Sequence, residues 1–98
     1  MALIELLWWA GCPSHPDVRA QLSALGVPFD EVEIVSDADA ERERFVGSPT
    51  IRVDGRDVFE ADEPPSLTCR VYRLPDGRFS PTPDPALLRA ALERAGAL

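Results

Sequence analysis

Two side chains with redox or nucleophilic chemistry, Cys12 and His15, lie three residues apart. An apolar run ends just before Cys12, and apolar residues return at helical spacing at Val18 and Leu22, so a buried strand is predicted to pass into a helix at the cysteine. The free N–H groups and the positive dipole end of such a helix stabilise a thiolate. A histidine there can stabilise that thiolate further or pass a proton to a leaving group. Cys12 and His15 are therefore the candidate catalytic residues.

Both residues also have an ordinary structural interpretation. A free cysteine is among the most often buried residue types and can serve as a small hydrophobic side chain. A histidine in the first turn of a helix can simply be solvated. A cysteine and a histidine at this spacing are a common pair, so only the strand-to-helix position favours chemistry over packing.

The sequence has one other cysteine, Cys69. Two cysteines give no disulfide framework and too few thiolates for a four-thiolate zinc or iron–sulfur site, so we expect no resident metal or other cofactor. Apolar and polar residues alternate in 67–74, which predicts a strand with Leu67, Cys69 and Val71 on one face. The Cys69 side chain is therefore expected to point into the core.

The segment Gly47-Ser48-Pro49-Thr50 leads into another strand pattern. Only ~5 to 6% of bonds before proline are cis in folded proteins. The spacing alone therefore predicts a trans proline at the start of a strand.

Length and charge exclude several classes of protein. A chain of 98 residues has room for one core, so we expect a single domain spanning residues 1–98. The net charge of −7 would be repelled by a phosphate backbone, which argues against nucleic-acid binding. The longest apolar stretch is far shorter than the ~20 residues of a membrane helix, and no basic lead precedes it. We therefore expect no membrane association and a cytoplasmic protein.

Strand and helix patterns follow one another in the order β-α-β-(α)-β-β-α, which is typical of an α/β domain. The predicted strands are Ala2–Trp9, Phe29–Val35, Thr50–Val53, Arg56–Phe59 and Leu67–Leu74, with a connector at Ser80–Pro83. Three helices are predicted. The first follows Cys12, with Ser14 as a possible N-cap, the second spans Ala38–Phe45, and the third begins at Asp84-Pro85. The first strand is expected to be central and the second an edge strand.

These segments together resemble the thioredoxin-like superfamily. The segment Leu7–His15 is similar to the strand-to-helix active-site turn of thioredoxins and glutaredoxins, and its Cys12-Pro13 resembles the glutaredoxin motif Cys-Pro-x-Cys. Gly47–Thr50 resembles the second element of that superfamily, a cis-proline that faces the catalytic thiol. The resemblance implies a mixed four-stranded sheet flanked by helices.

The same resemblance implies roles for individual residues. Cys12 would be the nucleophile and Pro49 the cis-proline, with Ser48 and Thr50 beside it in the substrate-binding segment. His15 stands where a dithiol site has its resolving cysteine, so a disulfide within this motif is impossible. A monothiol route would need an external thiol, such as glutathione as co-substrate, whereas in a second route Cys69 would resolve oxidised Cys12. The implied function is a thiol oxidoreductase or thiol carrier acting on protein or small-molecule thiols and disulfides.

A narrower resemblance links the chain to small bacterial thioredoxin-like proteins labelled alkylmercury-lyase-like. Its motifs are Gly11-Cys12-Pro13, Gly47-Ser48-Pro49-Thr50 with Val53-Asp54-Gly55-Arg56-Asp57, and Cys69-Arg70-Val71-Tyr72. This resemblance implies soft-metal or organomercurial handling by two thiolates, Cys12 and Cys69, with a carboxyl group as proton donor. True alkylmercury lyases are considerably longer and have a helical N-terminal region that this sequence does not show.

A third hypothesis is a non-catalytic binding module. In this case the groove at Pro49, or an exposed Trp8 or Trp9, would hold a peptide. Because the two tryptophans end a buried strand, their ordinary place is the core.

Overall fold

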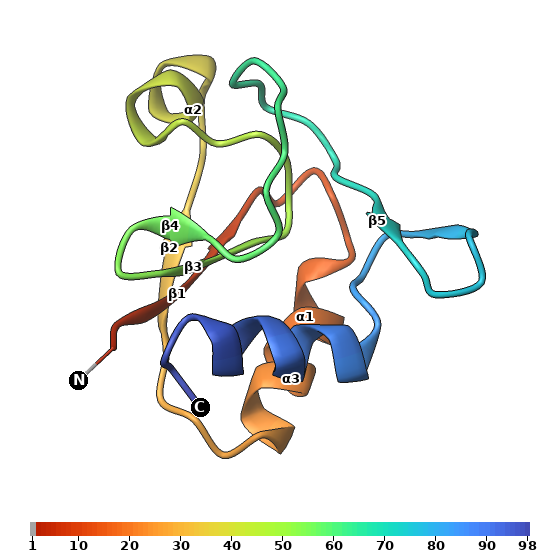
Figure 1. The fold of residues 1–98 in the computed structure, drawn as a ribbon. Helices are drawn as coiled ribbons and strands as arrows, with labels where there is room; N and C mark the ends of the chain where they lie inside the picture. Colours follow the sequence, from red (N-terminus) through yellow and green to blue (C-terminus); the bar gives the residue numbers. More distant parts are fainter. Residues whose placement is uncertain (1) are drawn as a thin grey trace.

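The computed structural model describes residues 2–98, which form a mixed α/β fold (Figure 1). The elements in chain order are β1 Ile4–Trp8, α1 His15–Ala24, β2 Asp30–Glu33, α2 Asp37–Glu43, β3 Thr50–Val53, β4 Arg56–Asp57, β5 Tyr72–Arg73, β6 Phe79–Ser80 and α3 Pro85–Arg94. None of the helices among these residues is long and apolar enough to cross a membrane.

A mixed four-stranded sheet with the strand order β2-β1-β3-β4 organises the fold. Strand β1 pairs in parallel with β2 and antiparallel with β3, which continues antiparallel to β4. The central position predicted for the first strand and the edge position predicted for the second are thus confirmed. On β2, Glu31 and Glu33 are exposed whereas the following Ile34 is buried, as expected from their alternation.

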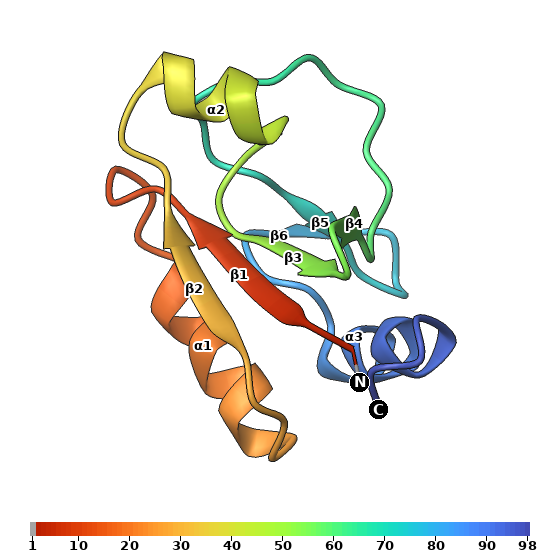
Figure 2. The ribbon, with the colours of Figure 1, turned by 90° about the vertical axis from the view of Figure 1, so that its left-hand side faces the viewer.

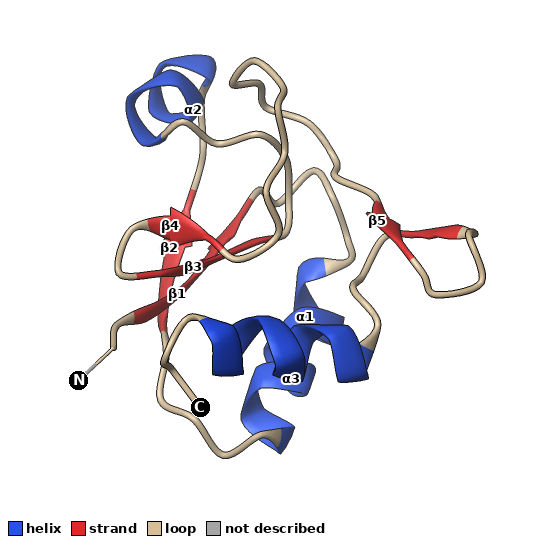
Figure 3. Cartoon of the chain, viewed as in Figure 1, coloured by secondary structure: helices blue, strands red, loops and turns tan. Residues whose placement is uncertain are grey.

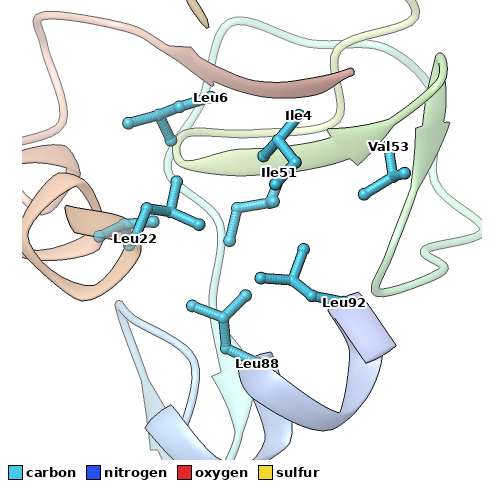
Figure 4. Packing of buried hydrophobic residues seen from close by; sticks show 8 residues of the cluster. Ile4, Leu6, Leu22, Ile51, Val53, Leu88 and Leu92 are labelled. Atoms are coloured by element: carbon cyan, nitrogen blue, oxygen red, sulfur yellow. The ribbon is translucent and has the colours of Figure 1, made fainter. Parts of the chain in front are cut away.

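Helices cover both faces of this sheet, as Figure 2 shows. Residues of α1 and α3 pack against one face in a cluster of eight buried side chains, most of which are seen in Figure 4. This cluster consists of Ile4, Leu6, Val18, Leu22, Ile51, Val53, Leu88 and Leu92. On the opposite face Leu7 packs with Ile34, Ala40 and Phe45 beside α2. Strand β1 therefore contributes apolar side chains to both clusters, which explains its nearly continuous apolar sequence.

Local sequence signals account for two of the helix starts. The Ser36 hydroxyl accepts from the Asp39 N–H at the start of α2, at 3.1 Å. The Asp84 carboxylate accepts from the Leu87 N–H at 3.1 Å, and Pro85 occupies the first turn of α3. Ser14 occupies the N-cap position of α1, as predicted, but its side chain makes no capping hydrogen bond.

The predicted strand Leu67–Leu74 is largely wrong. Only Tyr72–Arg73 forms strand β5, and it pairs with β6 in a separate two-stranded sheet, so part of the predicted connector is a strand instead. Figure 3 shows the long loop between β4 and β5 that takes the place of the rest. Buried and exposed residues still alternate in this segment, but the buried face is the opposite of the predicted one, because Tyr72 is buried whereas Val71 is 62% exposed.

Candidate functional site

The two cysteines form a disulfide bond in this structure. Cys12 lies in the turn between β1 and α1, and Cys69 lies in the loop before β5. Their Cα atoms are 5.5 Å apart, the usual separation for a disulfide. Cys12 is 3% exposed whereas Cys69 is exposed, so the prediction that Cys69 lies in the core is wrong. The reason is that its polar neighbour Arg70 turns inward, where its guanidinium finds partners.

The Cys69 segment pairs with the residue before Pro49. The Ser48 N–H donates to the Thr68 carbonyl at 2.8 Å, and the Arg70 N–H donates to the Ser48 carbonyl at 2.9 Å. Ser48 and Cys69 thus form an isolated parallel β-bridge. The Ser48–Pro49 bond is cis, so the trans bond that base rates predict is wrong here.

The side chains of the Ser48–Thr50 segment bond within the protein. The Ser48 hydroxyl accepts from the Trp9 N–H at 3.0 Å, which joins this segment to the end of β1. The Thr50 hydroxyl donates to the Gly47 carbonyl at 2.6 Å. All three residues from Ser48 to Thr50 are buried, and both backbone hydrogen-bonding groups of Ser48 are occupied by the Cys69 segment.

Gly47 allows the two segments to approach closely. Its φ of +141° is a conformation that residues with side chains rarely adopt. A Cβ atom at this position would lie 2.8 Å from the Cβ of Arg70. A larger residue at position 47 would therefore push the Cys69 segment away from Ser48.

Arg70 is the most elaborately bonded side chain near the disulfide. Its Nη1 donates to the Asp57 carboxylate at 2.6 Å and to the Thr50 hydroxyl at 3.3 Å, and Nη2 donates to the Phe59 carbonyl. The side chains of Arg70 and Asp57 are only 7% and 21% exposed. A nearly buried, multiply bonded ion pair therefore fixes the residue next to Cys69.

Tyr72 provides a second attachment for this segment. Its buried hydroxyl donates to the Pro49 carbonyl. Its ring lies edge-on to Phe59, with ring centres 5.2 Å apart, and carries the Arg70 guanidinium 4.8 Å from its centre. Burial raises the pKa of the Tyr72 phenol well above its ordinary value, so the hydroxyl stays protonated and remains a donor.

Sequence reasoning did not select Asp57, Arg70 or Tyr72 as site residues. The only signal was their presence in the motifs Val53–Asp57 and Cys69–Tyr72. Neither periodicity nor spacing indicates that Asp57 and Arg70 meet, because the pairing depends on how the long loop between β4 and β5 returns to the sheet.

His15 begins α1 and contacts the backbone of the Cys12 turn. Its Nδ1 lies 3.1 Å from the Cys12 carbonyl oxygen, and its ring stacks on Trp8 with centres 4.3 Å apart and an interplanar angle of 14°. The Ser14 hydroxyl lies 3.8 Å from the Cys12 sulfur. These contacts fix the imidazole within the first turn, next to Cys12.

The two tryptophans are half-buried and pack on opposite faces of the sheet. Trp8 packs against the cluster beneath α1 and α3, and Trp9 against the cluster beside α2. The ring of Trp9 also covers Gly11, where an added Cβ would lie 2.3 Å from a ring carbon. A larger residue at position 11 would therefore displace the Trp9 ring.

An open groove of about 780 Å³ borders the disulfide on the side of Cys69. Its lining includes Cys69, Val71 and Phe79 together with the charged residues Glu63 and Arg73. Val71 and Phe79 are 62% and 68% exposed. A molecule in this groove would meet Cys69 rather than Cys12, which is not part of its wall.

Within residues 2–98, no group of three or more histidine, cysteine or carboxylate side chains is arranged to hold a metal ion. Searches with protein-family models, among curated proteins and among solved structures each found no match to this chain. The function is therefore inferred from the geometry of the site itself.

Proposed function

We propose that this protein is a thioredoxin-like thiol oxidoreductase or thiol carrier that cycles between the Cys12–Cys69 disulfide and the corresponding dithiol. The observation that carries the proposal is the bond between a cysteine in the turn just before α1 and an exposed cysteine paired with Ser48, next to the cis Pro49. Of the two routes that the sequence leaves open, this bond favours an internal disulfide between Cys12 and Cys69 over a purely monothiol route.

The arrangement of the elements supports the thioredoxin-like class. The sheet has the order β2-β1-β3-β4, with α1 and α3 on one face and α2 on the other. Cys12 lies between β1 and α1, and Pro49 directly precedes β3, so both candidate motifs meet at the same end of neighbouring strands.

The chemistry would be a two-electron exchange. Reduced Cys12 and Cys69 together lose two electrons and two protons as they form their disulfide, and one substrate disulfide gains them to become two thiols. The unpaired N–H groups at the start of α1 favour the thiolate of Cys12. In the cytoplasm, where we expect the protein to act, a disulfide of this kind is transient and catalytic rather than structural.

The experiment that tests this function measures stoichiometric reduction of oxidised glutathione. The fully reduced protein is expected to release two molecules of glutathione for each Cys12–Cys69 disulfide formed, with the products identified by mass spectrometry. The variants Cys12→Ser and Cys69→Ser serve as controls, because neither can form the internal disulfide. A wild-type protein that exchanges no thiol with glutathione would refute the proposal.

A second candidate function is soft-metal handling, which is supported by the closeness of the two sulfur atoms. Two thiolates that form a disulfide can also approach one linear Hg²⁺ ion after reduction. Mercury binding to the reduced protein should then weaken strongly in Cys69→Ala. Binding unaffected by this substitution would refute a shared metal site.

A further inference from the structure

We infer that exchange with external thiols and disulfides takes place at the sulfur of Cys69, and that Cys12 acts as the resolving thiolate. This inference rests on the proposed function and specifies which of its two cysteines meets the substrate. It reverses the order that the sequence resemblance implies, in which Cys12 attacks the substrate directly.

Access to the two sides of the disulfide differs. Thiol–disulfide exchange requires the incoming thiolate to reach the sulfur that it attacks. Cys12 is 3% exposed, whereas Cys69 is exposed and forms part of the wall of the 780 Å³ groove. An incoming thiol therefore reaches Cys69 before Cys12.

Contacts other than the disulfide hold Cys69 over Cys12. Two backbone hydrogen bonds join its neighbours to Ser48, the Arg70 guanidinium is bonded to Asp57, and the Tyr72 hydroxyl is bonded to the Pro49 carbonyl. None of these contacts involves a sulfur atom. We therefore expect the Cys69 segment to stay in place after reduction and to keep covering Cys12.

The identity of the leaving group also supports exchange at Cys69. Attack on Cys69 expels Cys12, which lies in the turn just before α1, and the free N–H groups of that helix would favour its thiolate as the leaving group. In the opposite direction, the Cys69 thiolate attacks a substrate disulfide and releases one substrate thiolate. The Cys12 thiolate then attacks the sulfur of Cys69 in this mixed disulfide and releases the second. Both directions pass through the same mixed disulfide at Cys69.

The test compares how fast each single cysteine is captured by oxidised glutathione. Cys12→Ser leaves only Cys69, and Cys69→Ser leaves only Cys12. The rates are measured at about pH 9, above the ordinary thiol pKa of ~8.5, to reduce differences that come from ionisation rather than access. We expect capture at Cys69 to be at least about tenfold faster. The same two variants in denaturant should react at similar rates, which provides the matched control.

A second measurement uses the native chain and does not depend on either variant folding. The reduced wild-type protein is treated with less than one equivalent of a maleimide, and peptide mass spectrometry locates the label. Label mainly on Cys69 supports the inference. Faster capture or labelling of Cys12 overturns it while leaving the proposed function intact. Folded protein in which neither cysteine exchanges with glutathione overturns both.

Discussion

Substitution of Arg70 by methionine tests whether its ion pair stabilises the Cys69 segment. Methionine keeps the unbranched apolar stem of the side chain but removes the hydrogen bonds of the guanidinium to Asp57, Thr50 and the Phe59 carbonyl. Removing one partner of a buried ion pair costs about 3 to 5 kcal/mol, because the remaining charge loses its counter-charge. The Asp57 side chain is 21% exposed and still accepts from the Phe59 N–H at 2.9 Å, so we expect the lower end, about 3 kcal/mol.

For a domain of this size, that loss corresponds to a fall in Tm of roughly 12 to 24 °C. Thermal unfolding followed by circular dichroism measures it in the oxidised and the reduced protein. The matched control is Arg73→Met, which removes an exposed arginine three residues further along the chain and should change stability by no more than about 0.5 kcal/mol. A loss below about 1 kcal/mol in Arg70→Met would contradict the importance that we assign to this ion pair.

Three further predictions concern other parts of the molecule. Tyr72 is the only tyrosine, and its raised pKa means that the folded state holds the phenolic proton more tightly than the unfolded state does. The free energy of unfolding should therefore fall as the pH rises above about 10. Ultraviolet absorbance should show phenolate only as the protein unfolds. The hydrogen bond from Arg19 lowers the pKa of Glu31. Glu31→Gln should therefore lower the free energy of unfolding by about 0.5 kcal/mol near neutral pH, as measured in urea. This difference should vanish as the pH falls through the lowered pKa. Gly11→Ala should displace the Trp9 ring and lower the free energy of unfolding by about 1 to 3 kcal/mol, with a change in tryptophan fluorescence, whereas unchanged stability and fluorescence would show that the turn can absorb a Cβ.

The sequence predicts the sheet well where its pattern has one physical cause. The run Ala2–Trp9 is apolar because β1 supplies side chains to both faces of the sheet, and this pattern alone indicates a central strand. Likewise, Asp84-Pro85 combines a capping carboxylate with a first-turn proline, so the start of α3 could be read directly.

The segment around Cys69 could not be predicted because its pattern has two solutions. Alternation in 67–74 indicates two faces but does not say which is buried, and hydrophobicity favours the face of Cys69 and Val71. The structure buries Arg70 and Tyr72 instead, because Asp57, the Phe59 carbonyl and the Pro49 carbonyl satisfy their polar groups. These partners come from distant parts of the chain, and no local rule brings them together.

In our proposal, Cys12 and Cys69 form a reversible redox pair. This proposal is tested most directly by incubating the protein over a series of ratios of reduced to oxidised glutathione, trapping free thiols by alkylation, and counting modified cysteines by mass spectrometry. We predict one cooperative transition in which both cysteines change together, with no such transition in Cys69→Ser. Cysteines that titrate independently, or that stay unmodified at every ratio, would contradict it.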